Sequence, residues 1–134
     1  MKLISFSDGG ARGNPGPAGI GAVLFNDKNE IVEELSFYLG ETTNNQAEYR
    51  ALIMVMKKAQ SLGATELECY LDSELVVKQL NREYKVKNKD LAPLFLEVHN
   101  VSLSFKKVSF HHVPREKNSI ADGLANQAMD RKAN

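Results

Sequence analysis

The spacing of apolar residues changes part of the way along the chain. In the first forty positions, three apolar runs over residues 2–7, 18–26 and 30–40 predict β-strands, and the third follows the two-residue alternation of a strand. The polar stretch DKNE separates the second run from the third and indicates a hairpin turn. We therefore expect three strands in an antiparallel meander.

From residue 43 the period lengthens to three and four residues, which predicts an amphipathic helix over 43–62. The apolar stripe of this helix consists of Leu52, Val55, Ala59 and Leu62. Thr43 and Gln46 fit a capping box at its start, and Gly63 fits its end.

The rest of the chain alternates between short strands and helices. Strands are predicted over 65–71 and 105–113, and helices over 73–81, 90–103 and 119–132. The resulting order, β-β-β-α-β-α-α-β-α, predicts an α/β fold in which helices flank a five-stranded mixed sheet. With 134 residues, the chain suits a single domain over 1–134.

Composition restricts the partners without naming one. The formal net charge is zero, so contact with a polyanion must come from local clusters such as YKVKNK, whose ordinary interpretation is a solvated loop. One cysteine, Cys69, excludes an internal disulfide. No signal peptide or membrane span is apparent, so we expect a cytoplasmic protein with no membrane partner.

Four carboxylates stand at positions that local structure explains only in part. Asp8 is expected to end the first strand, where it would form an Asx-type turn, and Asp72 follows a strand, where it would cap a helix. Asp122 stands three residues after Ser119, as in a capping box. Glu48 heads the apolar stripe of the long helix, where an unpaired charge is expensive.

These positions converge if the first and fourth strands are neighbours, since ligand sites in open α/β sheets form beyond the carboxyl ends of strands. Clustered carboxylates repel one another unless cations hold them, and ligand sets of oxygen alone favour Mg²⁺ or Mn²⁺ over zinc. Two such ions about 4 Å apart suit in-line attack of water on a phosphodiester.

At this point four segments, in order and nearly end to end, resemble type 1 ribonuclease H: SDGGARGNPGPAGIGAV, TTNNQAEYRAL, YLDSELVV and HVPREKNSIADGLAN. The resemblance implies the ribonuclease H fold and endonucleolytic cleavage of the RNA strand of an RNA–DNA hybrid, leaving 5′-phosphate and 3′-hydroxyl ends. It implies two Mg²⁺ ions, with Mn²⁺ as an alternative, and a monomer. The family's catalytic and metal-binding acids fall on Asp8, Glu48, Asp72 and Asp122.

The same resemblance gives the glycine-rich turn a role, because small residues let main-chain groups reach a 2′-hydroxyl of RNA. Amide side chains near it can donate to phosphates or to base edges. The implied substrate-binding positions are Gly9, Gly10, Arg12, Asn14, Thr43, Asn44, Asn45 and Gln46.

The chain departs from well-known bacterial members in two places. It has no Trp, and the short NREYKVKNK replaces a long basic handle. The segment before Asp122 is also shorter than the loop that carries an assisting His in those members. We place Arg115 near the metal site in that role, and the alternative is a solvated loop arginine.

Three other functions fit the sequence less well. A non-catalytic hybrid- or RNA-binding module predicts a lost carboxylate, and none is lost. A resolvase or transposase core usually brings added DNA-binding segments. A nucleotide-binding protein needs its glycine loop to lead into a helix, whereas here it leads into a strand.

Overall fold

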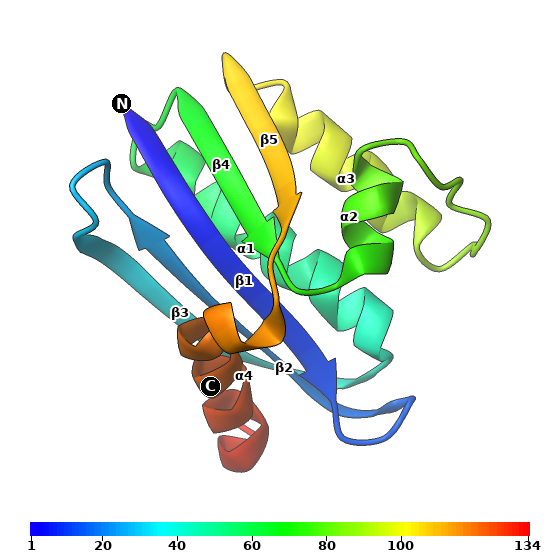
Figure 1. Ribbon diagram of the computed structural model, residues 1–134. Helices are drawn as coiled ribbons and strands as arrows, with labels where there is room; N and C mark the ends of the chain where they lie inside the picture. Colours follow the sequence, from blue (N-terminus) through cyan, green and yellow to red (C-terminus); the bar gives the residue numbers. More distant parts are fainter.

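The computed structural model describes all residues from 1 to 134, and five strands form one mixed sheet in it (Figure 1). The strand order is β3-β2-β1-β4-β5, with antiparallel pairing on one side of β1 and parallel pairing on the other. The strands are β1 Lys2–Ala11, β2 Gly16–Phe25, β3 Ile31–Thr42, β4 Glu66–Leu71 and β5 Lys107–His112. The meander and the crossover units predicted from the sequence are confirmed.

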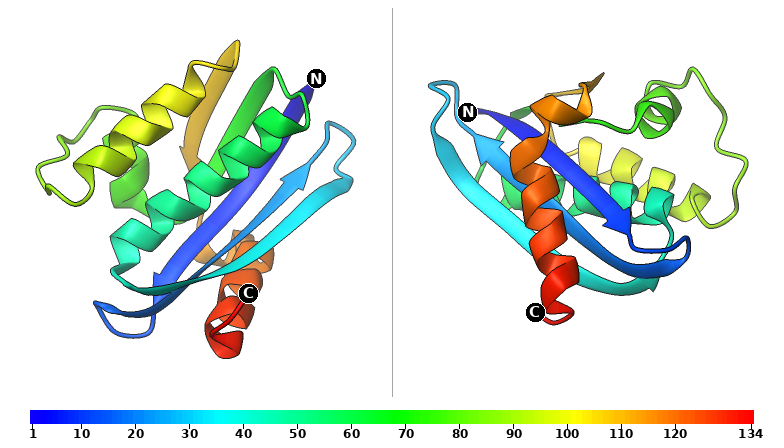
Figure 2. Two further views of the ribbon diagram at one scale, coloured as in Figure 1. Left: turned by 180° about the vertical axis from the view of Figure 1, so that it is seen from behind. Right: turned by 60° about the horizontal axis from the view of Figure 1, so that its bottom comes forward.

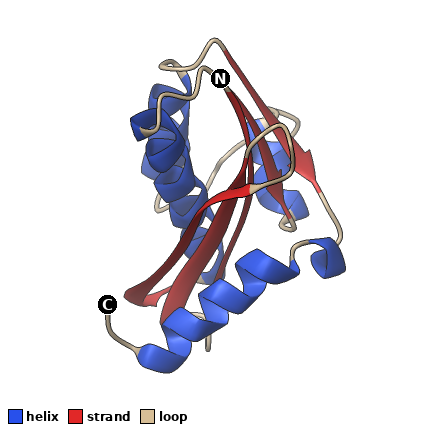
Figure 3. Cartoon of the chain, turned by 90° about the vertical axis from the view of Figure 1, so that its left-hand side faces the viewer, coloured by secondary structure: helices blue, strands red, loops and turns tan.

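Four α-helices and one short 3₁₀ turn complete the chain. They are α1 Asn44–Ser61, α2 Glu74–Leu80, α3 Ala92–Ser102, the 3₁₀ turn Arg115–Lys117 and α4 Ser119–Arg131. α1 and α3 lie on one face of the sheet and α4 crosses the other face (Figures 2 and 3). None of the helices combines the length and the hydropathy that a membrane span requires.

The main core lies between the sheet and α1. Leu3 of β1, Leu67 of β4, and Leu52 and Val55 of α1 are almost completely buried there. Burying one such side chain contributes about 1.5–3 kcal/mol, so this layer fixes α1 against the sheet. Leu62, the last residue of the predicted stripe, instead lies past the helix and is exposed.

At the start of α1, one of the two hydrogen bonds of the predicted capping box is present. The Thr43 hydroxyl accepts a hydrogen bond from the Gln46 main-chain N–H at 3.3 Å. The side chain of Gln46 does not return to the main chain of Thr43, because its Oε1 accepts from the hydroxyl of Thr42. The end of β3 and the first turn of α1 are therefore tied together by side chains.

Two glycines permit close packing of helices on opposite faces of β1 and β2. A Cβ on Gly9 would lie 2.2 Å from the main-chain carbonyl of Ala47 in α1. A Cβ on Gly21, which pairs with Asp8, would lie 2.1 Å from the main-chain oxygen of Ala121 in α4. Part of the glycine surplus in the sequence is therefore required by helix packing.

Candidate active site

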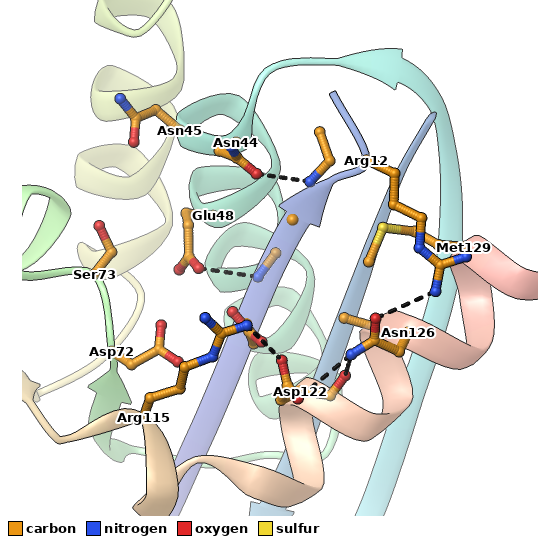
Figure 4. Close-up of a pocket in the computed structure, with 15 residues that line it drawn as sticks. Arg12, Asn44, Asn45, Glu48, Asp72, Ser73, Arg115, Asp122, Asn126 and Met129 are labelled. Carbon is orange, nitrogen blue, oxygen red and sulfur yellow. Dashed lines mark hydrogen bonds and ion pairs between the residues drawn. The ribbon is translucent and has the colours of Figure 1, made fainter. Parts of the chain in front are cut away.

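A cleft of about 460 Å³ opens where β1, β4, α1 and α4 meet (Figure 4). Its walls come from five segments of the chain. The lining residues are Asp8, Gly9, Gly10, Ala11, Arg12, Asn44, Asn45, Glu48, Asp72, Ser73, Arg115, Asp122, Ala125, Asn126 and Met129. All five residues predicted to be catalytic are among them.

Asp8 lies at the centre of the cleft, but not at a strand end. β1 continues to Ala11 and pairs with β2 throughout, with Asp8 opposite Gly21. The expectation that Asp8 ends the first strand was therefore wrong. What ends nearby is the parallel pairing with β4, whose last pair is Ser7 and Leu71. Asp8 thus projects just where β1 leaves its parallel neighbour.

Glu48 reaches the cleft from the second turn of α1, with only 6% of its surface exposed. The main-chain N–H of Gly9 donates to its Oε1 at 3.2 Å, and its Oε2 is buried with no partner. Because Gly9 lacks a side chain, the α1 backbone can approach β1 closely enough for this bond. An unpartnered buried carboxylate oxygen is costly, which fits a site that receives a cation.

Asp72 directly follows β4 and is free to face the cleft. The helix-capping role that the sequence allowed for it belongs to Ser73, whose hydroxyl accepts from the N–H of Val76 at 3.3 Å. Ser73 therefore caps α2, and the adjacent Asp72 is left to line the cleft.

Asp8, Glu48 and Asp72 form a compact group. Each offers a carboxylate oxygen, and these oxygens lie within 4.8 Å of one another. Burial raises the pKa of Asp8 to about 7; the neighbouring Glu48 carboxyl group lowers it in part, and the charge of Asp72 raises it. Burial is the main cause that raises the pKa of Glu48 well above its usual value, and the neighbouring Asp8 carboxylate adds to it. Without a cation, Asp8 and Glu48 therefore favour retaining protons.

Asp122 stands beside this group in the first turn of α4. The N-cap of α4 is Asn118 rather than Ser119, so the capping-box alternative does not apply. The side-chain amide of Asn118 donates to the main-chain oxygen of Ser7 at 2.9 Å, which ties this end of α4 to β1 just before Asp8. The Asp122 carboxylate faces Arg115, whose Nη2 lies 3.5 Å from Oδ1.

Arg115 comes from the 3₁₀ turn that links β5 to α4, and 79% of its side chain is exposed. An ion pair so open to water contributes little to stability, generally below about 1 kcal/mol. Arg115 thus lies at the rim of the cleft beside one of the four acids, and its catalytic role stays a prediction.

The predicted substrate-binding residues divide into two groups. Gly9, Gly10, Arg12, Asn44 and Asn45 line the cleft, whereas Asn14, Thr43 and Gln46 do not.

The side-chain amides of Asn14 and Asn44 join the glycine turn to the start of α1. Asn44 Oδ1 accepts from the N–H of Ala11 at 2.7 Å, and Asn14 Oδ1 accepts from the N–H of Asn44 at 3.1 Å. Each amide oxygen is thus occupied within the protein, so each Nδ2 remains as a donor. Thr43 and Gln46 are engaged at the start of α1, and their contact with substrate stays a prediction.

Sequence reasoning missed several cleft residues, of which Asn126 and Met129 carry the clearest signal. They stand four and seven residues after Asp122, so they share its face of α4. Helical spacing could have indicated both. Nothing in the sequence shows that this face of α4 meets the β1–β2 turn.

The fold is that of a known class of proteins. The family described as Reverse transcriptase-like matches residues 6–128. The chain is 45% identical to the Bifunctional protein Rv2228c of Mycobacterium tuberculosis over 134 residues, which is 99% of this chain and 37% of that protein. It is 41% identical to Ribonuclease HI of Halobacterium salinarum over 129 residues, 96% of this chain and 65% of that one.

Solved structures agree in detail. The crystal structure of RNase H1 from Halobacterium salinarum superposes with a TM-score of 0.95 at 40% identity, covering 98% of this chain and 99% of that one. LC11-RNase H1, solved in complex with an RNA/DNA hybrid, superposes with a TM-score of 0.92 at 45% identity, covering 96% and 97%. The chain belongs to the ribonuclease H family. It spans about a third of the mycobacterial relative that it matches.

Proposed function

We propose that this protein is an endoribonuclease that hydrolyses the RNA strand of RNA–DNA hybrids. The observation that carries this proposal is the group of three carboxylates within 4.8 Å, two of them buried, in a cleft bordered by the glycine turn. Relatives named ribonuclease H, and a similar structure solved with an RNA/DNA hybrid, support the choice of substrate.

The residues present fit divalent cations. Their donors are carboxylate oxygens alone, which is the set that Mg²⁺ or Mn²⁺ prefers, and Glu48 Oε2 is buried without any partner inside the protein. We propose Asp8, Glu48, Asp72 and Asp122 as the ligands. When bound, the two ions would activate water and stabilise the leaving oxygen, giving 5′-phosphate and 3′-hydroxyl ends.

The chain itself supplies position and selectivity. The N–H of Gly9 orients Glu48, and Arg115 lies against Asp122 at the rim, where a phosphate would pass. A Cβ on Gly10 would have only a Met129 methyl group and Asn44 Oδ1 within 4 Å, so packing inside the protein does not require a glycine there. A glycine at this place leaves room for a substrate sugar to approach the main chain.

The test is cleavage of one end-labelled sequence in four forms: RNA–DNA hybrid, duplex RNA, duplex DNA and single-stranded RNA. Each is incubated with Mg²⁺, with Mn²⁺ and with chelator. Cutting of only the RNA strand of the hybrid, dependent on metal, supports the proposal, and the labelled ends report the end chemistry. A hybrid that is bound but never cut would instead indicate a binding module.

In the same assay Asp8→Asn, which removes one candidate metal ligand, should not cut the hybrid, and its matched control is Asp27→Asn. Asp27 lies in the exposed turn between β2 and β3, outside the cleft, so its loss changes net charge as Asp8→Asn does. We expect full cleavage from this variant. A monomeric state and a cytoplasmic location remain predictions from the sequence, and light scattering of the purified protein tests the first.

A further inference from the structure

One face of α4 carries Asp122, Asn126 and Asp130 at four-residue spacing, and Arg12 reaches this face from the turn between β1 and β2 (Figure 4). Arg12 Nη2 donates to Asn126 Oδ1 at 3.3 Å, and Arg12 Nη1 lies 2.7 Å from Asp130 Oδ1. The glycine-rich turn is thereby joined to the helix that carries the fourth acid.

Asn126 stands between Arg12 and Asp122. Its Nδ2 donates to the main-chain oxygen of Asp122 at 3.0 Å and to Asp122 Oδ2 at 3.4 Å. An asparagine amide has one accepting end and one donating end. Because Arg12 offers only donors, it binds the oxygen end, and the NH₂ group must then face the carboxylate.

Asp122 needs such a partner. It lies outside the compact group of three carboxylates, on a side chain that is 32% exposed, and the charge of Asp8 beside it is repulsive. Arg115 meets one carboxylate oxygen from the rim, and Asn126 meets the other from within α4. Two donors on opposite oxygens restrict rotation of the carboxylate.

We propose that Asn126 is a positioning residue that holds the Asp122 carboxylate towards the cleft, and that Arg12 sets the orientation of the Asn126 amide. The expected effect on cleavage rests on the proposed function. The expected effect on the orientation of Asp122 rests only on the contacts within this chain. It gives Arg12 a task beyond the substrate contact predicted from the sequence.

The first test compares Asn126→Ala with Gln127→Ala, the exposed neighbour on the same helix. Alanine has a higher helix propensity than asparagine or glutamine, so neither change lowers the intrinsic helix propensity of α4. With hybrid substrate, we expect Asn126→Ala to lower kcat about tenfold while KM stays within about twofold, because the lost hydrogen bond acts on a charged group. Gln127→Ala should behave as the wild type. Asn126→Asp, which keeps the shape but removes the donor, should lower kcat further.

The second readout needs neither metal nor substrate. In isotope-labelled, metal-free protein, three-bond couplings report the χ1 rotamer of Asp122. We expect a single rotamer in the wild type and in Gln127→Ala, and averaged couplings in Asn126→Ala. A single unchanged rotamer in Asn126→Ala would overturn the inference, whatever its activity.

The role of Arg12 is tested by a double-mutant cycle. If Arg12 acts through Asn126, the double variant Arg12→Ala/Asn126→Ala has the same kcat as Asn126→Ala alone. Independent losses that multiply would show that Arg12 does not act through the amide. A wild type that cuts no hybrid would refute the proposed function, and the rotamer measurement would still decide the inference.

Discussion

At the scale of single residues, the cleft contains several carboxylates whose burial and mutual repulsion destabilise the folded state. Asp8 and Glu48 are nearly buried, and Asp72 lies within reach of both. Burial raises the pKa of Asp8 and of Glu48, and the charge of Asp72 raises both further, so the site favours a bound cation or a bound proton. Such a group lowers the stability of the folded protein when no cation is bound. Its presence is therefore better explained by a functional role than by a structural one.

Asp8→Asn tests this directly. The amide keeps the shape of the side chain and removes a charge that is repelled by its neighbours. We expect cleavage to fall at least about a thousandfold, while the melting temperature in chelator stays the same or rises. Activity gels and thermal melts, with Asp27→Asn beside it, measure both. An unfolded Asp8→Asn would make Asp8 a structural residue instead.

Arg115→Ala should have a milder effect. Its guanidinium is exposed and touches only Asp122 among the acids, so its loss leaves the three-carboxylate group intact. We expect kcat to fall about threefold to tenfold with unchanged stability, and partial recovery in Arg115→Lys, which keeps the charge but not the planar fork. Steady-state kinetics measure this effect. An unchanged kcat would show that Arg115 is a solvated loop arginine with no role in catalysis.

At the scale of elements, the site depends on how closely α1 and α4 approach the sheet. Gly9 sits under the α1 backbone and Gly21 under the α4 backbone, so the two helices close on β1 and β2 from opposite faces. This approach brings Glu48 of α1 and Asp122 of α4 to the same cleft as Asp8.

Gly9→Ala and Gly10→Ala form a matched pair that separates packing from substrate contact. An added methyl group at Gly9 would overlap the α1 backbone. We therefore expect the free energy of unfolding to fall by about 3 kcal/mol or more, and activity to be lost. At Gly10 the nearest atom lies 3.7 Å away, so stability should change by less than about 1 kcal/mol while KM for the hybrid rises. Urea unfolding and kinetics on both variants measure this. Equal destabilisation of the two would contradict the assignment.

At the scale of the whole molecule, the buried acids should control how stability depends on pH. The pKa of Asp8 is about 7 in the folded state and 3.8 when unperturbed. Below pH 3.8 Asp8 is therefore protonated in the folded and the unfolded state, and above about pH 7 it is ionised in both. Between these values the folded state retains a proton that the unfolded state has released. The free energy of unfolding therefore falls as pH rises through this window, and Glu48 extends the fall upwards.

Melting temperatures in chelator should accordingly drop between about pH 4 and pH 7, and the drop should be smaller in Asp8→Asn. Mg²⁺ added near pH 8 should raise the melting temperature of the wild type, because it binds the folded state only. A melting temperature that rises steadily across this window in chelator would show that other groups dominate.

The sequence alone determined the succession of elements and the identity of the four acids, because both depend on local period and residue type. The fold class followed from that succession, as did the expectation that β1 and β4 are neighbours. The family resemblance, carried by segments nearly end to end, named the candidate ligands before any distance was known.

The tertiary structure decided what depends on contacts between distant segments. It extended β1 past Asp8, because pairing with β2 continues after pairing with β4 has ended. It gave the capping role beside Asp72 to Ser73, and it placed Asn126 between Arg12 and Asp122. Periodicity reports which face of an element is apolar, but not which distant backbone that face meets, so these assignments required the folded chain.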